Sequence, residues 1–580
     1  DVIDAAGNWD GRIDDVRSQV VDFCSAAEQL GKQLSEALLR PLARALAVKV
    51  LAAAKERVAS GALEFHDLLV ASRDLLRRDG NARATLQRTY RRILLDEFQD
   101  TDPIQIELAV RIAGGADAAA EDWHDVLVPP GSLFVVGDPK QSIYRFRRAS
   151  IETYLEAGAH FGRRVSLTTN FRTVPPVLDW INDVFARIIV ENPGKQPRYE
   201  GLDAHRTAGP SYAGPAVTVL GADPHQKGAL ADALREAEAA DVASVVRTAL
   251  AEGWTVFDQG AELWRPVRAG DIAILLPART SLRFLEAALD RAGIPYRTES
   301  SSLVYQADEI RALMAAVRAI ADPSDDLATV QALRTTLFGC GDDDLFRYRR
   351  AGGRFSVTSP VRDEIADSPV GRAMAYLNGL YRRSRWLSPA ELLTELAVDR
   401  RVLEVAATVE PSSRARDQWG RVRFVIDQAR AWSDVQHGGL RAYLAWASHQ
   451  AQDAARVAEA LLPETDVDVV RVMTVHAAKG LEFGVTSQPR KETGVRLLWR
   501  DRGYAVKLGG SIETNDFADA SPIDEQMDDA ERRRLLYVAA TRARDHLVVS
   551  LHRAEGGSET AAKILVDAGA LDVAGVKRYE

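Results

Sequence analysis

The sequence is poor in cysteine and has no long apolar run. It contains 2 cysteines in 580 residues, which excludes a disulfide framework, and neither has the spacing of a metal ligand. No segment approaches the roughly 20 uninterrupted apolar residues of a membrane span, and the first residues lack the pattern of a signal peptide. We therefore expect a cytoplasmic protein without membrane contact.

An excess of positive charge is also missing. The 74 Lys and Arg residues are outnumbered by 83 Asp and Glu residues, which gives a net charge of -9. The overall field therefore does not indicate a nucleic-acid partner, and any DNA contact must be local. With 46% hydrophobic residues, the chain has enough apolar material to bury a core, and its 580 residues suffice for three or four domains.

The most informative feature is an apolar strand that ends in two carboxylates. Leu94 and Leu95 precede Asp96 and Glu97. At the end of a buried strand, Asp96 would meet Mg²⁺ directly or through water, and Glu97 would orient an attacking water as general base. A lone Asp-Glu pair would more often cap the next helix, so the assignment depends on its neighbours.

A second apolar strand, residues 133–136, runs into another polar loop. Because ligands bind at the carboxyl ends of parallel strands, both loops are expected to face one nucleotide, with Gln141 placed to sense its γ-phosphate. Tyr144 and Phe146 alternate with Arg145 and Arg147, which is typical of a base-stacking platform surrounded by phosphate-binding cations. The alternative is that the two aromatic residues belong to the core of a strand.

Five segments together resemble a known family. They are DEFQDTDPIQ (96–105), VGDPKQSIYRFRRA (136–149), LTTNFRT (167–173), TVHAAKGLEF (474–483) and RRLLYVAATRARDHL (533–547). In this order they are similar to the motor motifs of superfamily 1 helicases of the UvrD/Rep type. The second segment is closer to the RecB and AddA branch than to UvrD.

The resemblance implies roles for individual residues in binding and hydrolysing ATP with Mg²⁺. Asp96 and Glu97 match the magnesium and catalytic positions, and Gln141 matches the residue that couples the γ-phosphate to DNA. Four further residues are implied at the nucleotide: Phe171 against adenine, Arg172 and Arg542 at the γ-phosphate, and Glu482 at the ribose. The residues implied at DNA are Tyr144, Phe146, Arg147, His476 and Lys479.

The chain lacks one motif that such a motor needs. No segment has the form G-x-x-x-x-G-K-[ST], whose backbone amides and lysine hold the β- and γ-phosphates. The simplest expectation is an amino-terminal truncation that removed this loop and its strand. The alternative is a natural degenerate motor retained as a DNA-binding scaffold.

Two smaller departures concern the later motifs. After Phe483 the chain has poor strand character, where the family continues as an apolar strand, and this puts the packing around Glu482 in question. Arg148 stands where the family usually has glycine. We expect the DNA platform to be shaped differently as a result.

The predicted fold class is α/β, with two RecA-like parallel-sheet lobes of the P-loop NTPase type and helical insertions. Residues 1–60 are predicted as a helical remnant of an insertion and 61–165 as the first lobe. Residues 166–322 and 464–580 are predicted as the two parts of the second lobe, separated by a mobile helical subdomain at 323–463. The closing helix is expected to run from Asp529 to Arg544 and to carry Arg542.

These features predict an ATP-dependent DNA helicase or single-stranded DNA translocase of DNA repair or recombination, 3'-to-5' by resemblance, here lacking the phosphate loop. Its partner is DNA, either single-stranded or duplex with a single-stranded end. One alternative is the helicase subunit of a RecBCD/AddAB-like helicase-nuclease with a nuclease or helicase partner subunit. Another is a DNA-binding subunit that does not hydrolyse ATP.

Overall fold

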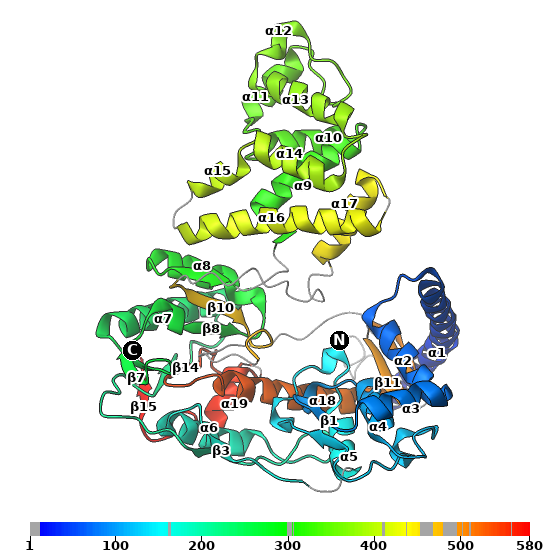
Figure 1. Ribbon diagram of the computed structural model, residues 1–580, viewed down its shortest axis with the longest axis vertical. Helices are drawn as coiled ribbons and strands as arrows, with labels where there is room; N and C mark the ends of the chain where they lie inside the picture. Colours follow the sequence, from blue (N-terminus) through cyan, green and yellow to red (C-terminus); the bar gives the residue numbers. More distant parts are fainter. Residues whose placement is uncertain are drawn as a thin grey trace.

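The computed structural model describes residues 12–160, 164–298, 304–305, 307–408, 412–436, 438–452, 468–479, 496–500, 503–509, 512–557 and 559–579. The predicted α/β class with parallel sheets is confirmed (Figure 1). The helices are α1 (Ile13–Ser60), α2 (Phe65–Arg78), α3 (Gly80–Thr89), α4 (Pro103–Ala113), α5 (Ile151–His160), α6 (Pro175–Ile188), α7 (Ala231–Glu252), α8 (Leu282–Arg291), α9 (Asp308–Ala321), α10 (Asp326–Arg334), α11 (Asp342–Arg350), α12 (Asp363–Ala366), α13 (Pro369–Arg383), α14 (Pro389–Asp399), α15 (Val402–Ala407), α16 (Ser412–Val435), α17 (Leu440–Gln452), α18 (Phe517–Ala540) and α19 (Ala561–Asp567).

The strands are short. They are β1 (Ile93–Leu95), β2 (Leu133–Val135), β3 (Thr169–Asn170), β4 (Asp203–Ala204), β5 (Val217–Leu220), β6 (Thr255–Asp258), β7 (Leu263–Pro266), β8 (Ala273–Leu276), β9 (Tyr296–Thr298), β10 (Val470–Thr474), β11 (Arg496–Arg500), β12 (Gly503–Gly509), β13 (Ile512–Glu513), β14 (Leu547–Ser550) and β15 (Val576–Arg578).

The first lobe, from α2 to α5, is built around the parallel pair β1 and β2. Leu95 pairs with Val135, so the loops that follow the two strands leave the same edge of the sheet. One face packs on a core that includes Phe98, Ile106 and Val110. The prediction that the first of these strands, β1, is buried is wrong for the other face, where Leu94 is exposed, because among the described residues helices cover only one side.

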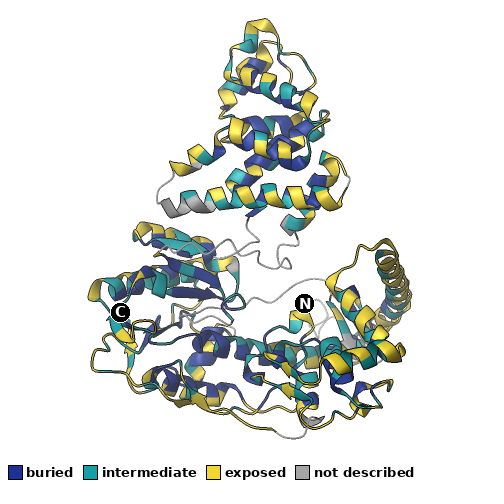
Figure 2. Ribbon diagram, viewed as in Figure 1, coloured by how far each residue is buried: buried dark blue, intermediate teal, exposed yellow. Residues whose placement is uncertain are grey.

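Helix α1 stands at the outer edge of the first lobe and is almost entirely exposed (Figure 2). It ends at Ser60 and is capped by Gly61, which adopts a left-handed conformation with φ 73° that suits glycine at this position. Arg57 near its end donates to both carboxylate oxygens of Asp67 in α2, at 2.8 and 2.9 Å. This ion pair fixes the corner between the two helices.

The second lobe contains two three-stranded parallel sheets, ordered β14-β5-β15 and β8-β10-β9. Helices α6 and α19 pack with the first sheet in a core around Trp180 and Phe185. Helices α7 and α8 pack with the second. Strands β8 and β10 are neighbours although helices α9 to α17 lie between them in sequence, so the helical unit is inserted into this lobe, as Figure 1 shows.

The helical unit has one continuous core that extends from Val304 to Ala447. It therefore begins before residue 323, the predicted boundary, because α9 contributes apolar residues such as Leu313 and Val317 to that core. In Figure 1 the unit projects away from the two lobes. None of the described helices is both long and apolar enough to span a membrane.

Helix α18 joins the lobes. Val538 of this helix packs with Ile143 of the first lobe and with Leu275 and Met473 of the second. The helix was expected at Asp529 to Arg544, but it begins at Phe517 and ends at Ala540, so Arg542 lies in the turn after it. An antiparallel sheet of β11, β12 and β13 contacts α18 and had not been predicted.

Candidate functional site

The loop after β1 presents two exposed carboxylates. Glu97 adopts a left-handed conformation with φ 52°, which is strained for a residue with a side chain. Its amide donates to Asp96 Oδ1 at 2.9 Å. The capping alternative is wrong, because the side chain that caps α4 is Asp102, which accepts from the amide of Ile104.

The buried side chain of Gln99 connects this loop with the loop after β2. Its Nε2 donates to Glu97 Oε2 at 2.5 Å, and its Oε1 accepts from the amide of Asp138 at 3.0 Å. Gly137 is required at the contact, since a Cβ there would lie 2.5 Å from Gln99 Oε1. Gln99 therefore holds the catalytic candidate Glu97 in register with the second loop.

Gln141 lies where the two lobes meet. Its Nε2 donates to Asp138 Oδ2 at 3.1 Å within the first lobe. Its Oε1 accepts from Arg542 Nη2 at 3.3 Å, and its carbonyl oxygen accepts from Lys479 Nζ at 2.7 Å. Both of these donors belong to the second lobe, so a movement of one lobe relative to the other would change the hydrogen bonds of Gln141.

Lys479 forms a second connection between the lobes. Its ammonium group, in a side chain only 5% exposed, donates to Asp100 at 2.7 and 2.5 Å. Burial lowers the pKa of Lys479 and raises the pKa of Asp100, while the attraction between the two groups opposes both shifts. Lys479 was predicted to contact DNA, but in this structure its donors are directed at the first lobe.

A cluster of three aromatic rings and one arginine, called here the aromatic platform, is formed by Tyr144, Phe146, His476 and Arg147. Phe146 is 62% exposed in a short helical turn, Arg145–Arg147, so the alternative of a strand core is wrong for it. Its ring centroid lies 5.3 Å from that of His476, and the Arg147 guanidinium lies 5.2 Å above the Tyr144 ring. The Tyr144 hydroxyl donates to the His476 carbonyl at 2.9 Å, and burial lowers the pKa of the His476 imidazole.

The other two arginines of this segment have different partners. Arg145 forms ion pairs with Asp524 and Asp528 of α18, so its charge is directed at the protein. Arg148 has φ 69°, a left-handed conformation that glycine adopts without strain. Glycine, which the resemblance leads us to expect at this position, would adopt this backbone freely, whereas arginine adopts it at a conformational cost.

The second lobe contributes two loops that are bonded to each other. Asn170 Oδ1 accepts from the amides of Arg172 and Thr173, and Thr173 Oγ1 donates to the Ala543 carbonyl at 3.0 Å. The loops that carry Arg172 and Arg542 are therefore held together. Phe171 is 65% exposed and its ring contacts that of His205 at 4.7 Å, which leaves ring surface available for a ligand.

Arg534 is a site residue that was not identified from the sequence. It is buried, and its Nε donates to the Ser142 carbonyl at 2.7 Å. Its spacing from Tyr537 and Val538 on the apolar stripe of α18 was the available signal. Gln99 was also missed as a site residue, and Glu482 lies outside the described residues.

The chain is similar to helicases in both halves. Residues 15–162 match the family model of the UvrD/REP helicase N-terminal domain, and residues 456–554 match the UvrD-like helicase C-terminal domain. Three relatives, each described as an ATP-dependent helicase/nuclease subunit, match most of the chain. The relative from Exiguobacterium sibiricum is 27% identical, and the match covers 90% of this chain and 45% of that protein. The relative from Geobacillus kaustophilus is 27% identical, with 87% of this chain and 43% of that protein covered. The relative from Listeria innocua is 25% identical, with 86% of this chain and 42% of that protein covered. The chain thus spans somewhat under half the length of these relatives.

Proposed function

We propose that this chain, which belongs to the UvrD-like helicases through its two matched domains, is the ATP-dependent DNA motor of a helicase/nuclease subunit. The observation that carries the proposal is the position of Gln141. It contacts Asp138 in its own lobe and Arg542 and Lys479 in the other, three residues before the aromatic platform begins at Tyr144. A structural change caused by binding or hydrolysis of the nucleotide would be transmitted to the DNA-binding residues through Gln141.

In this proposal the nucleotide binds between the lobes. Glu97 orients the attacking water, while Gln141, Arg172 and Arg542 contact the γ-phosphate. Planar guanidinium groups suit this task, because the charge that develops in phosphoryl transfer spreads over several oxygens. The exposed ring of Phe171 stacks on adenine. The ribose contact at Glu482 rests on the resemblance alone.

The carboxylates fit a magnesium ion. Mg²⁺ is held in nucleotide sites by one or two carboxylates together with phosphate oxygens and waters, and it needs no cage of protein ligands. The described residues contain no group of three or more His, Cys, Asp and Glu side chains placed to hold a metal, while Asp96 and Glu97 supply the two exposed carboxylates that such a site uses. When bound, the ion neutralises charge on the phosphates.

DNA is proposed to bind at the aromatic platform. A base would stack on the exposed ring of Phe146, and Arg147 and the loop of His476 would face the backbone. Lys479 would hold the lobes together through Asp100 and reach DNA only after those bonds break. Nucleotide-driven closure of the lobes would then move a single strand past Phe146, 3'-to-5' by resemblance.

The proposal extends to an assembly. The relatives are described as subunits of an ATP-dependent helicase/nuclease, and we infer that this chain also acts with a partner subunit on DNA that has a single-stranded end, in repair or recombination. A DNA-binding subunit that does not hydrolyse ATP is the second candidate. It is favoured by one observation, namely that the 580 residues contain no phosphate-loop motif.

Steady-state ATP hydrolysis with excess single-stranded DNA separates the candidates. The 580-residue chain is expected to show no appreciable hydrolysis, because nothing in it replaces the backbone amides and lysine of the phosphate loop. A longer version that supplies the loop should hydrolyse ATP. In that version Glu97→Gln should lower turnover about 10² to 10⁴-fold, since the amide cannot accept the proton, while ATP and DNA still bind.

Glu121→Gln, an exposed carboxylate in the same lobe, is the matched control and should leave turnover unchanged. Wild-type turnover of Glu97→Gln would remove Glu97 from the catalytic role. An inactive longer version that still binds DNA would favour the second candidate.

A further inference from the structure

Helix α1 has a continuous apolar face that is largely exposed. With about 100° of rotation per residue, this face is centred on Leu34 and extends about 40° to either side of it. Between residues 16 and 52 every residue on the face is apolar. Before Leu34 it consists of Val16, Val20, Phe23, Ala27 and Leu30, and after Leu34 of Leu38, Pro41, Ala45, Val48 and Ala52. We call this face the α1 seam.

The contact of α1 with its own molecule leaves the α1 seam open (Figure 2). The buried residues of the helix are Ser35 and Leu39, which point about 100° and about 140° away from Leu34. On the α1 seam, by contrast, Phe23 is 74% exposed and Leu38 is 71% exposed. Contiguous apolar surface of this kind marks a site of interaction with another molecule or segment.

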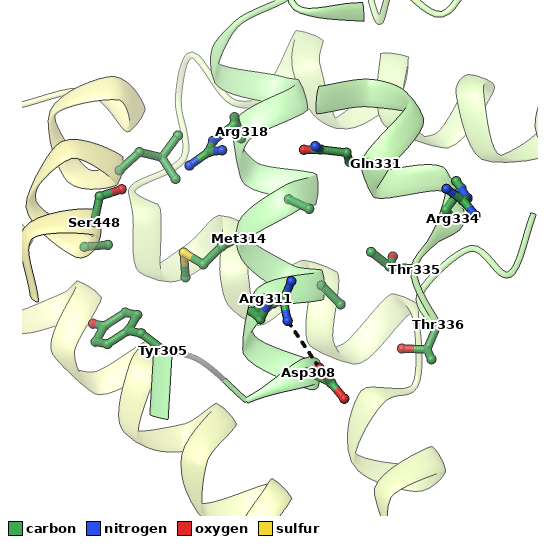
Figure 3. Close-up of a pocket in the computed structure, with 14 residues that line it drawn as sticks. Tyr305, Asp308, Arg311, Met314, Arg318, Gln331, Arg334, Thr335, Thr336 and Ser448 are labelled. Carbon is green, nitrogen blue, oxygen red and sulfur yellow. Dashed lines mark ion pairs between the residues drawn. The ribbon is translucent and has the colours of Figure 1, made fainter. Parts of the chain in front are cut away.

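The groove of the helical unit, of about 760 Å³ between α9, α10 and α17, is a different kind of open surface (Figure 3). Its lining includes the charged and polar side chains of Arg318, Gln331 and Ser448. Water hydrates such groups, so the groove can stay open at little cost in free energy. Apolar side chains gain free energy when they leave water. Of the two surfaces, the α1 seam therefore has the stronger tendency to be covered.

The charge distribution along α1 indicates what covers it. Residues 13–36 contain five acidic and two basic side chains, whereas residues 37–60 contain five basic and one acidic side chain. Asp15 and Asp22 in the first half lie on the same side of the α1 seam as Arg44 and Lys55 in the second half. A second α1 in antiparallel orientation would bring acidic residues opposite basic ones, and a parallel one would bring like charges together.

The sizes of the apolar residues also agree with antiparallel pairing. The α1 seam extends equally far on both sides of Leu34, over about 54 Å in all, so a two-fold axis at this residue places the whole seam against itself. Leu30 then faces Leu38 of the second copy, and Phe23 faces Ala45 of the second copy. A large residue opposite a small one lets the two helices pack closely.

We propose that the α1 seam binds a second copy of this chain, whose own α1 lies antiparallel to the first about a two-fold axis at Leu34. Helix α1 stands at the outer edge of the first lobe (Figure 1), where another molecule can approach it. The proposal goes beyond the proposed function and does not depend on it, because the two helices pair without nucleotide or DNA.

The test is analytical ultracentrifugation of the full 580-residue chain over a wide range of concentration, without nucleotide or DNA. The seam variant carries Leu30→Glu and Leu34→Glu. The control carries Val50→Glu and Leu51→Glu, which change equally exposed residues of the same helix outside the α1 seam. The unchanged chain and the control should form dimers as the concentration rises. The seam variant should raise the dissociation constant of the dimer at least about 100-fold, since four leucines per dimer lose their burial.

Two further experiments test the orientation. Asp22→Lys and Arg44→Asp should each weaken the dimer several-fold, and the chain that carries both changes should regain it, because opposite charges again face each other. In a Cys24→Ser background, a mixture of Leu30→Cys and Leu38→Cys chains should form a disulfide-linked dimer on oxidation. Either variant alone should form little, because the two cysteines would lie about 12 Å apart along the helix.

A chain that stays monomeric at all concentrations would overturn the proposal, as would equal dissociation constants for the seam variant and the control. Cross-linking of either single variant alone as readily as the mixture would indicate parallel helices and would also contradict it. A longer version of the protein that stays monomeric where the 580-residue chain dimerises would show that another segment covers the α1 seam, and the assignment to a second copy would be wrong.

Discussion

Arg148 follows the aromatic platform in a left-handed conformation, with φ 69°, and contacts His66. A residue with a Cβ pays about 1 to 2 kcal/mol for this conformation, which glycine adopts freely. We predict that Arg148→Gly is more stable than Arg148→Ala by about 1 kcal/mol. Both variants lose the contact with His66, so the difference isolates the backbone.

The measurement is the urea midpoint of the two variants side by side. If the alanine variant is as stable as the glycine variant, the left-handed conformation does not occur at this position in solution. The DNA affinity of the glycine variant is a second measurement, since glycine adopts this conformation beside the platform without strain.

Individual side chains differed in how well they could be predicted. Asp96, Glu97 and Gln141 follow apolar runs. Because the carboxyl ends of neighbouring parallel strands lie at the same edge of a sheet, their loops could be predicted to lie close together. Gln99 and Arg534 could not be placed in this way, because their partners lie about 40 and almost 400 residues away, Asp138 and Ser142. A polar side chain can be buried when acceptors that are distant in sequence form hydrogen bonds with it. The local sequence pattern around the residue does not indicate such acceptors.

At the scale of elements, Arg534 holds α18 against Ser142 of the first lobe and against the segment of the second lobe that carries Lys195 and Gln196. The guanidinium donates to the carbonyls of Ser142 and Lys195 and to Gln196 Oε1, at 2.7, 2.9 and 2.6 Å. We predict that Arg534→Ala lowers the free energy of unfolding by about 2 to 4 kcal/mol, since three acceptors, two of them in buried hydrogen bonds, lose their donor and a cavity remains.

Arg532→Ala is the matched control, because Arg532 is partly exposed and its one ion pair within the described part of the chain is with Asp529 of the same helix. It should change stability by less than about 0.5 kcal/mol. Chemical unfolding of the two variants compares them. Equal stabilities would mean that the buried contacts of Arg534 contribute nothing.

The corner between α1 and α2 has a predictable pH dependence. The Arg57 guanidinium, with help from the amide of Glu64, lowers the pKa of Asp67 to about 2. The unfolded value is about 3.9. Because the folded pKa is depressed, the stabilisation is complete above the unfolded pKa and is lost as the pH falls through the folded one.

We therefore predict that Asp67→Asn is less stable than the unchanged chain near neutral pH, and that the difference disappears between about pH 4 and about pH 2. Urea unfolding followed by circular dichroism at several pH values measures it. Asp74→Asn, on the same helix, is the control. A difference that persists unchanged at about pH 2 would show that the carboxylate charge is not its cause.

Strands with apolar runs were predicted well, because burial in a parallel sheet selects such runs. The apolar runs at 216–220, 271–276, 469–475 and 547–551 each predict a strand, and β5, β8, β10 and β14 lie within one or two residues of these ranges. The first half of α18 was missed. Its acidic residues Asp524 and Asp528 bond to Arg145 across the lobe boundary, so the helix there carries no apolar stripe that a local pattern could detect.

For the whole molecule, the order of the motifs predicted which segments meet, and the structure shows how. Core packing of Ile143 with Met473 and Val538 joins the lobes, and Lys479 and Arg542 add polar contacts across the boundary. These contacts depend on the relative orientation of the two lobes, which sequence patterns within single helices and strands do not specify. The start of the helical unit was predicted at residue 323 and lies at Val304 for the same reason, because the boundary is set by tertiary packing.

The central claim is that DNA binds at the platform adjoining Gln141. Anisotropy of a labelled single strand tests it most directly, with Phe146→Ala compared against Trp386→Ala, which removes an even more exposed aromatic ring from the helical unit. We predict that Phe146→Ala weakens binding by about 1 to 3 kcal/mol, the range for one lost base stack, with little change in sequence preference or stability. Trp386→Ala should have no effect. Unchanged affinity of folded Phe146→Ala, or an equal loss in both variants, would contradict the account.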